Sequence, residues 1–102
     1  MKYRSTRGQT DELPFMDAIL TGQAPDGGLF LPTELPDFSD KLDSWRDLSY
    51  TELAFEIMSV FANDIPQDDL KDIIEKAYST FREEEVTPLA PAGKNLILEL
   101  FH

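Results

Sequence analysis

The sequence contains no cysteine, and other residues with dedicated chemistry are scarce: its 102 residues include one histidine and five glycines. Without cysteine the chain forms no disulfide and no thiolate metal site. A single histidine excludes a zinc site with two histidine ligands and disfavours a Ser-His-Asp triad. The glycines form neither a G-x-G-x-x-G pattern nor a Walker loop. We therefore expect no metal site and no catalytic residues within this chain.

Basic residues are also few, because nine lysines and arginines face 20 acidic residues, for a net charge of −11. Such a surface repels phosphate backbones and anionic lipid headgroups, so we expect neither a nucleic-acid partner nor a membrane partner. No apolar stretch approaches the length of a membrane span, and the N-terminal MKYRSTRG has no signal-peptide core. These features predict a cytoplasmic protein.

The first eight residues depart from this acidic character. They hold Lys2, Arg4 and Arg7 without any acid. Three such charges could cradle an anion. We favour packing against the acidic remainder of the chain, because a few exposed charges are weak evidence for a site.

The pattern of apolar residues predicts one small α+β domain with three helices and short strands. Ser49 and Glu52 form a capping box at the start of the middle helix, whose strongly apolar composition predicts a central position. Trp45 is the expected anchor of an acidic loop over 37–47. The segment 82–95 carries closely spaced prolines and a glycine and is predicted to be a linker. The expected helices are about 14–21, 49–62 and from 66 onward, and the expected strands are 2–6, 29–31 and 95–101.

The segment APDGGLF contains a strong turn sequence, Pro25-Asp26-Gly27-Gly28. Proline presets one backbone dihedral, and glycine permits positive φ. The glycines could bring backbone N–H groups up to a ligand beside Asp26. The interpretation that we favour is a tight turn that enters a strand.

Several segments together resemble the N-terminal region of threonine synthase. Those that carry the resemblance are YRSTRG (3–8), APDGGLFLP (24–32), LSYTELAFEIMSVF (48–61), IPQDDLKDIIEKAYSTF (65–81) and ILELFH (97–102). The resemblance implies a pyridoxal-phosphate enzyme of the fold type related to tryptophan synthase β. That enzyme converts O-phospho-L-homoserine and water into L-threonine and phosphate, the last step of threonine biosynthesis.

The resemblance also implies a division of the chain. Residues 1–94 correspond to the N-terminal domain, and residues 95–102 correspond to the first strand of the catalytic domain, just before the lysine that binds the cofactor. The expected partners are therefore the remainder of the catalytic domain and, in the full-length enzyme, pyridoxal phosphate and O-phospho-L-homoserine. The 102-residue chain alone is expected to hold no cofactor and to be inactive.

Six residues are candidates for the margin of the active site under this resemblance. The alternative is that they serve domain docking, which we favour for the arginines and leave open for the turn. His102 is placed near the site by the family motif. The six candidates are Arg4, Arg7, Asp26, Gly27, Gly28 and His102.

Two other functions stay open. One is a threonine-synthase-like phospho-lyase, a paralogue that shares this region and acts on related phosphorylated amino alcohols. The other is a stand-alone acidic helical interaction module or regulatory subunit. The sequence decides neither the oligomeric state nor regulation by effectors.

Overall fold

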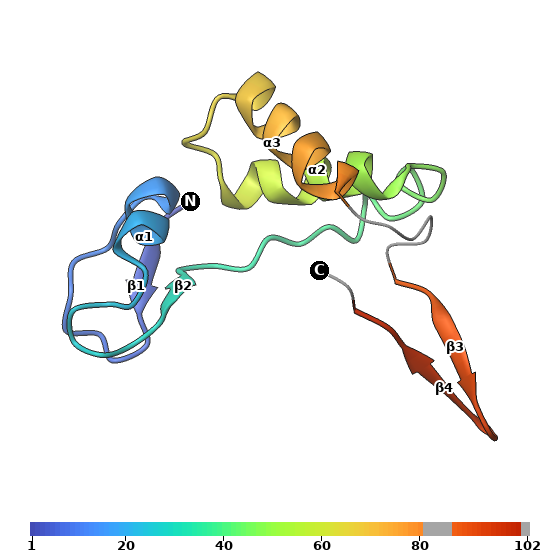
Figure 1. Ribbon diagram of the computed structural model, residues 1–102. Helices are drawn as coiled ribbons and strands as arrows, with labels where there is room; N and C mark the ends of the chain where they lie inside the picture. Colours follow the sequence, from blue (N-terminus) through green and yellow to red (C-terminus); the bar gives the residue numbers. More distant parts are fainter. Residues whose placement is uncertain (81–86, 101–102) are drawn as a thin grey trace.

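The computed structural model describes residues 1–80 and 87–100, and these residues form an α+β fold, as predicted (Figure 1). They contain three helices and two separate two-stranded antiparallel sheets. In chain order the elements are β1 (Tyr3–Ser5), α1 (Phe15–Thr21), β2 (Phe30–Pro32), α2 (Tyr50–Phe61), α3 (Gln67–Ser79), β3 (Leu89–Ala92) and β4 (Asn95–Leu98).

The first sheet pairs β1 with β2, two strands that are far apart in the sequence. Arg4 lies opposite Leu31 in the register, and Ser5 lies opposite Phe30. Along β1 the buried and exposed residues alternate, as expected for a strand with one covered face. Tyr3 also forms an antiparallel bridge with Leu13 on the other side of the strand. The start of the chain is thus held from two directions.

Helix α1 begins one residue later than the sequence predicts. Pro14 was expected to be the first helical residue, but its ψ of 168° is extended, so it occupies the N-cap position. Proline has no side-chain acceptor with which to cap a helix. Asp64, from the turn between α2 and α3, accepts a 2.9 Å hydrogen bond from the Met16 N–H instead. A distant carboxylate therefore satisfies one of the free N–H groups at this helix start.

The two longer helices pack against each other and carry the main hydrophobic core. Ala62, Leu70 and Ile74 are buried at its centre. The predicted capping box is present, because the Glu52 N–H donates to Ser49 Oγ and the Ser49 N–H donates to the Glu52 carboxylate. Phe15, Ala54, Phe55, Ile65 and Tyr78 are partly buried against this core.

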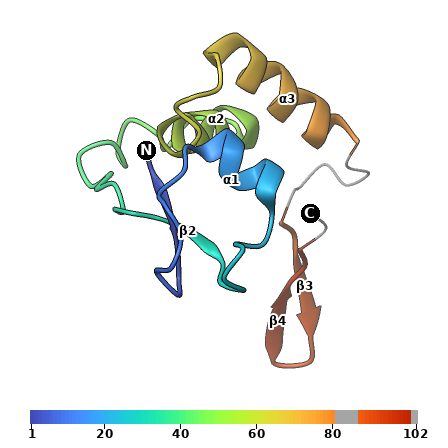
Figure 2. The same cartoon turned by 90° about the vertical axis from the view of Figure 1, so that its left-hand side faces the viewer.

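The expectation that α2 is a central helix is wrong. None of its residues is fully buried, although its composition is strongly apolar. The physical reason is that, among the described helices and strands, only α3 packs extensively on α2, which leaves the other sides of the helix partly exposed. Figure 2 shows the two helices as a pair above the first sheet.

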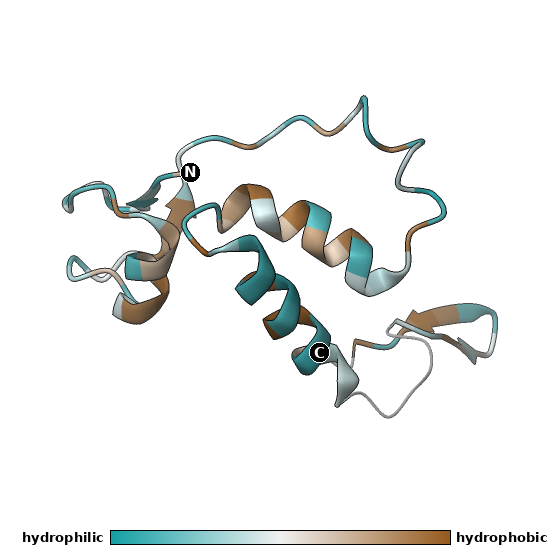
Figure 3. Ribbon diagram, turned by 90° about the horizontal axis from the view of Figure 1, so that it is seen from above, coloured by the Kyte–Doolittle hydropathy of each residue, from teal (hydrophilic) through white to brown (hydrophobic). Residues whose placement is uncertain are grey.

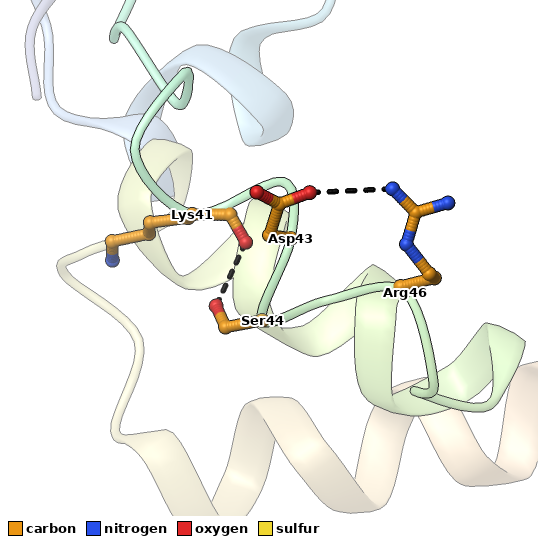
Figure 4. Close-up of polar contacts among 4 residues, drawn as sticks. All are labelled: Lys41, Asp43, Ser44 and Arg46. Atoms are coloured by element: carbon orange, nitrogen blue, oxygen red, sulfur yellow. Dashed lines mark hydrogen bonds and ion pairs between the residues drawn. The ribbon is translucent and has the colours of Figure 1, made fainter.

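The acidic loop between β2 and α2 is anchored by Trp45, as predicted. The indole is buried, and its ring centroid lies 5.2 Å from that of Phe38. The polar contacts of this loop are local (Figure 4). Arg46 pairs with Asp43 at 3.2 Å, and the Ser44 hydroxyl donates to the Lys41 carbonyl at 2.7 Å. Because these side chains are exposed, they contribute little, and the aromatic contact is what holds the loop.

The predicted linker is wrong over 89–92, which form strand β3; its residues 82–86 lie outside the described part of the chain. Strand β3 pairs with β4 in a local hairpin, with Ala92 opposite Asn95. Gly93 opens the turn with a φ of 64°. The prolines do not prevent pairing, since an edge strand tolerates proline. Strand β4 is shorter than the predicted 95–101, and the hairpin joins residues on both sides of the domain boundary predicted at 94.

Candidate functional site

The turn between α1 and β2 lies against the end of β1, and the two together form what we call the Asp26 cluster: Ser5, Arg7, Asp26, Gly27 and Gly28. The turn is closed by a 2.8 Å hydrogen bond from the Gly27 N–H to the Ala24 carbonyl. Gly27 has a φ of 79°, which only glycine adopts at little cost. Four of the six predicted site residues are therefore brought together here.

The Asp26 carboxylate is the centre of the cluster and accepts three hydrogen bonds. Oδ1 accepts from the Ser5 hydroxyl at 2.7 Å and from the Gly28 N–H at 2.9 Å. Oδ2 accepts from the Gln9 N–H at 3.0 Å. The Ser5 hydrogen bond is the largest cause that lowers the pKa of Asp26, followed by the two N–H groups and the charge of Arg7, while desolvation opposes them.

This environment decides what Asp26 can do chemically. A carboxylate with a lowered pKa stays ionised at neutral pH and is a poor proton acceptor. Its oxygens are occupied by donors from residues 5–9, at and after the end of β1, and from its own turn. In this structure Asp26 therefore links the end of β1 to the turn.

Gly28 is the tightest position of the cluster. It is buried, and a Cβ atom built there would lie 2.1 Å from Ser5 Oγ and 3.0 Å from Asp26 Oδ1. Any larger residue would separate the serine from the carboxylate. The N–H groups of Gly27 and Gly28 both donate within the chain, to Ala24 and Asp26 respectively.

The two arginines of the basic start differ in their contacts. Arg7 lies over Gly27 and donates a 3.0 Å hydrogen bond from Nη1 to the Asp26 carbonyl. Arg7 thus packs against an acidic residue, Asp26, as expected for the basic start of the chain. Arg4 is exposed on the outer face of β1, and within residues 1–80 and 87–100 it makes no ion pair. Its guanidinium is free to meet a group from outside these residues.

Tyr3 connects the first sheet to the helical pair. Its hydroxyl donates a 2.9 Å hydrogen bond to the Phe61 carbonyl at the end of α2. Burial raises the pKa of Tyr3, and the charge of Asp64 adds to this effect. Its ring also contacts Phe15, with 5.6 Å between centroids. The position of the Asp26 cluster relative to the helices depends on this residue.

Sequence reasoning did not identify Ser5 or Tyr3 as site residues. Their alternation in YRST indicates that both face inward, but no local signal reveals that Ser5 binds a carboxylate 21 positions away. His102, the sixth predicted residue, lies outside the described residues.

The described residues offer little other chemistry. No group of histidine, aspartate or glutamate side chains there is arranged to hold a metal ion. No helix in this part of the chain is long and apolar enough to cross a membrane. All the lysines are exposed: Lys2, Lys41, Lys71, Lys76 and Lys94.

The fold and the Asp26 cluster define a small α+β module. The family model described as "Threonine synthase N terminus" matches residues 2–78. The chain belongs to this family, the N-terminal region of threonine synthases.

Curated relatives and solved structures agree with this membership. Threonine synthase from Schizosaccharomyces pombe is 44% identical over all of this chain, which covers 21% of that protein. Threonine synthase-like 2 from Pongo abelii is also 44% identical and is covered to 22%. The crystal structure of PLP-bound threonine synthase from Brucella melitensis matches the whole chain with a TM-score of 0.88 at 43% identity, over 23% of its length. The chain therefore spans about a fifth of the length of these relatives.

The described residues do not fit pyridoxal phosphate. Because every lysine is exposed, none has the apolar surroundings that activate an amine for imine formation. Arg4, Arg7 and Ser5 do line one depression of about 420 Å³, but it is open to solvent and contains no lysine.

Proposed function

We propose that the full-length protein containing this chain is a threonine synthase, which converts O-phospho-L-homoserine and water into L-threonine and phosphate. The observation that carries this proposal is the family match over residues 2–78. It is supported by the threonine synthases that match the chain along its entire length. Pyridoxal phosphate is present in the Brucella melitensis structure and is the proposed cofactor of the full-length protein.

In this proposal the chain supplies an N-terminal domain, residues 1–94, and the first strand of a catalytic domain, residues 95–102. The cofactor lysine belongs to a part of the full-length protein outside residues 1–102. The exposure of the five lysines supports this assignment. The chain alone then neither holds the cofactor nor turns over substrate, and the full-length protein acts in the cytoplasm.

The six predicted residues have two candidate roles, at the margin of the active site or in domain docking. For Arg4 and Arg7 we propose domain docking, and attraction of a phosphorylated substrate is the alternative. Asp26, Gly27 and Gly28 hold Arg7 in place, because its guanidinium bonds the Asp26 carbonyl, and both roles stay open for this turn. His102 is proposed to lie near the site in the intact enzyme.

A second candidate function is a phospho-lyase of the threonine-synthase-like group. The specific observation in its favour is the 44% identity to threonine synthase-like 2. A stand-alone acidic interaction module is less well supported, since the described residues and the family match extend over an enzyme's N-terminal region.

The test is a product assay on the purified full-length protein with its cofactor and O-phospho-L-homoserine. We expect L-threonine and phosphate in equal amounts. Phosphate without threonine would support the phospho-lyase, and release of neither product would contradict both enzymes. In the same assay, Arg7→Ala and Asp26→Ala with unchanged kcat/KM but a lower Tm would leave only a docking or folding role.

A companion titration tests the proposal for the isolated chain. Pyridoxal phosphate is added to residues 1–102 and to the full-length protein while the imine absorbance band is followed. We expect saturation with the full-length protein only. Saturable binding by the 102-residue chain would contradict the placement of the cofactor lysine elsewhere.

A further inference from the structure

Helix α1 and strand β2 enclose a shallow groove of about 450 Å3 on the side of the first sheet. Its lining is almost entirely apolar, with aromatic rings at the floor and aliphatic side chains at the rim. The residues that line it include Tyr3, Phe15, Ala18, Ile19, Leu29 and Leu31.

The rim of the groove is exposed although it is hydrophobic. Ile19 is 57% exposed, Leu29 63% and Leu31 53%, and Leu20 on the same helix is 78% exposed. Hydrophobic side chains that gather on one surface in this way mark an interaction site, whereas scattered ones do not. Figure 3 shows the hydrophobic colouring of α1 beside the first sheet.

No described part of the chain covers this groove. The β3–β4 hairpin lies at the opposite end of the molecule (Figure 1), and the helical pair packs on the other side of Phe15. A second copy of the chain is disfavoured because each copy carries a net charge of −11, and two such surfaces repel.

The length of the relatives indicates what covers it. The chain spans 21% to 23% of the matched threonine synthases, so in the proposed full-length protein roughly four fifths of the polypeptide lies outside residues 1–102. We propose that a segment of the same polypeptide from outside residues 1–102 docks in the α1–β2 groove and fills it with apolar side chains. This proposal rests on the proposed function, because that function requires the longer polypeptide.

A positive charge lies beside the groove: Arg4 does not line it, but Arg4 and Leu31 line a neighbouring open depression. Arg4 lies opposite Leu31 in the strand register, so both residues face the same side of the sheet. Arg4 makes no ion pair within residues 1–80 and 87–100. An acidic residue of a docking segment that extends past Leu31 would therefore meet an unpaired guanidinium.

Thiol labelling of the full-length protein tests the proposal, because residues 1–102 contain no cysteine that would interfere. Single substitutions Leu29→Cys and Ile19→Cys report on the groove. The matched control is Leu35→Cys, a leucine that is 82% exposed and does not line the groove. Mass spectrometry of the peptides identifies the labelled site. We expect labelling of the groove cysteines to be at least about tenfold slower than that of the control.

Equal labelling rates would overturn the proposal. Protection that disappears on dilution would also overturn it, because the occupant would then be a second copy. Hydroxyl-radical footprinting of Leu29 and Leu35 in the unsubstituted protein gives the same comparison if a cysteine variant fails to fold. Threonine formation is measured separately. A protein that forms threonine but whose groove cysteines are labelled as fast as the control refutes only the docking in the groove. A protein that forms no threonine but whose groove cysteines are protected refutes only the proposed function.

Discussion

The two antiparallel sheets of this chain are similar in size but are supported in different ways. The β1–β2 sheet joins segments more than twenty residues apart, buries Tyr3 and Ser5, and is tied to α2 through the Tyr3 hydroxyl. The β3–β4 sheet is a local hairpin in which all four residues of β4 are exposed. Its leucines and isoleucine face solvent on both sides, with Leu96 65% and Ile97 54% exposed.

The difference lies in whether residues of this chain bury the apolar side chains of each sheet. A two-stranded hairpin with no packed face is marginally stable in water. An apolar run such as LIL in β4 is typical of a strand that is covered on both faces. The first sheet and the helical pair therefore form a self-supported unit, while the second sheet depends on contacts outside the described residues.

The largest expected effect comes from removing a core side chain. Leu70 is 2% exposed, so Leu70→Ala should cost about 2–5 kcal/mol of unfolding free energy through the lost burial and the cavity left behind. In the second sheet, Leu96→Ala should change stability by less than about 0.5 kcal/mol. Chemical denaturation of the 102-residue chain measures both. Similar losses would show that the hairpin belongs to the cooperative unit.

A smaller effect is expected from glycine substitutions at the turns of the two sheets. Gly28→Ala forces a methyl group against Ser5 Oγ and disrupts its hydrogen bond to Asp26, which should cost about 3 kcal/mol. Gly93→Ala meets open space and carries only the strain of positive φ, about 1 kcal/mol. Thermal unfolding of both variants gives the comparison. The reverse order of Tm values would contradict the role assigned to the Asp26 cluster.

The smallest effect is a pH dependence of the first sheet. The pKa of Asp26 is lowered in the folded chain, so its contribution to stability is fully present above the unfolded pKa of about 4. That contribution is lost as the pH falls through the lowered folded pKa. Asp26→Asn should therefore be less stable than the parent chain at pH 7, with the difference shrinking in acid.

The control for this pH series is Asp43→Asn, whose carboxylate is 97% exposed and contacts Arg46 only at the surface. It should change stability little at any pH. Unfolding curves recorded between neutral pH and pH 2 test both variants. A constant difference between Asp26→Asn and the parent chain would show that the carboxylate charge does not stabilise the turn.

The sequence correctly predicted those features that depend on contacts between residues three or four positions apart. Ser49 and Glu52 are three residues apart, and their reciprocal hydrogen bonds form as the capping box predicts. The spacing of Leu70 and Ile74 placed both on the buried face of α3. Gly22 was expected to end α1, and its N–H indeed bonds Ala18 and Ile19.

Predictions failed where the outcome depends on pairing or packing with another element of the fold. The prolines and the glycine of 82–95 are typical of a linker, yet pairing with β4 makes 89–92 a strand. The apolar composition of α2 indicated a central helix, but burial depends on how many layers surround a helix, and only α3 packs closely on it. At the start of α1, the Met16 N–H donates to the carboxylate of Asp64, 48 positions away, which no local pattern predicts.

The sequence by itself determined the α+β class, the capping box of α2, the tight turn at Asp26 and the family, because each depends on residues close together or on their order along the chain. Only the tertiary structure decided that Ser5, Gln9 and Gly28 converge on one carboxylate, and that Tyr3 fastens the first sheet to α2. These contacts join segments separated by up to 58 positions. No local pattern encodes them, because they arise from the packing of the folded chain as a whole.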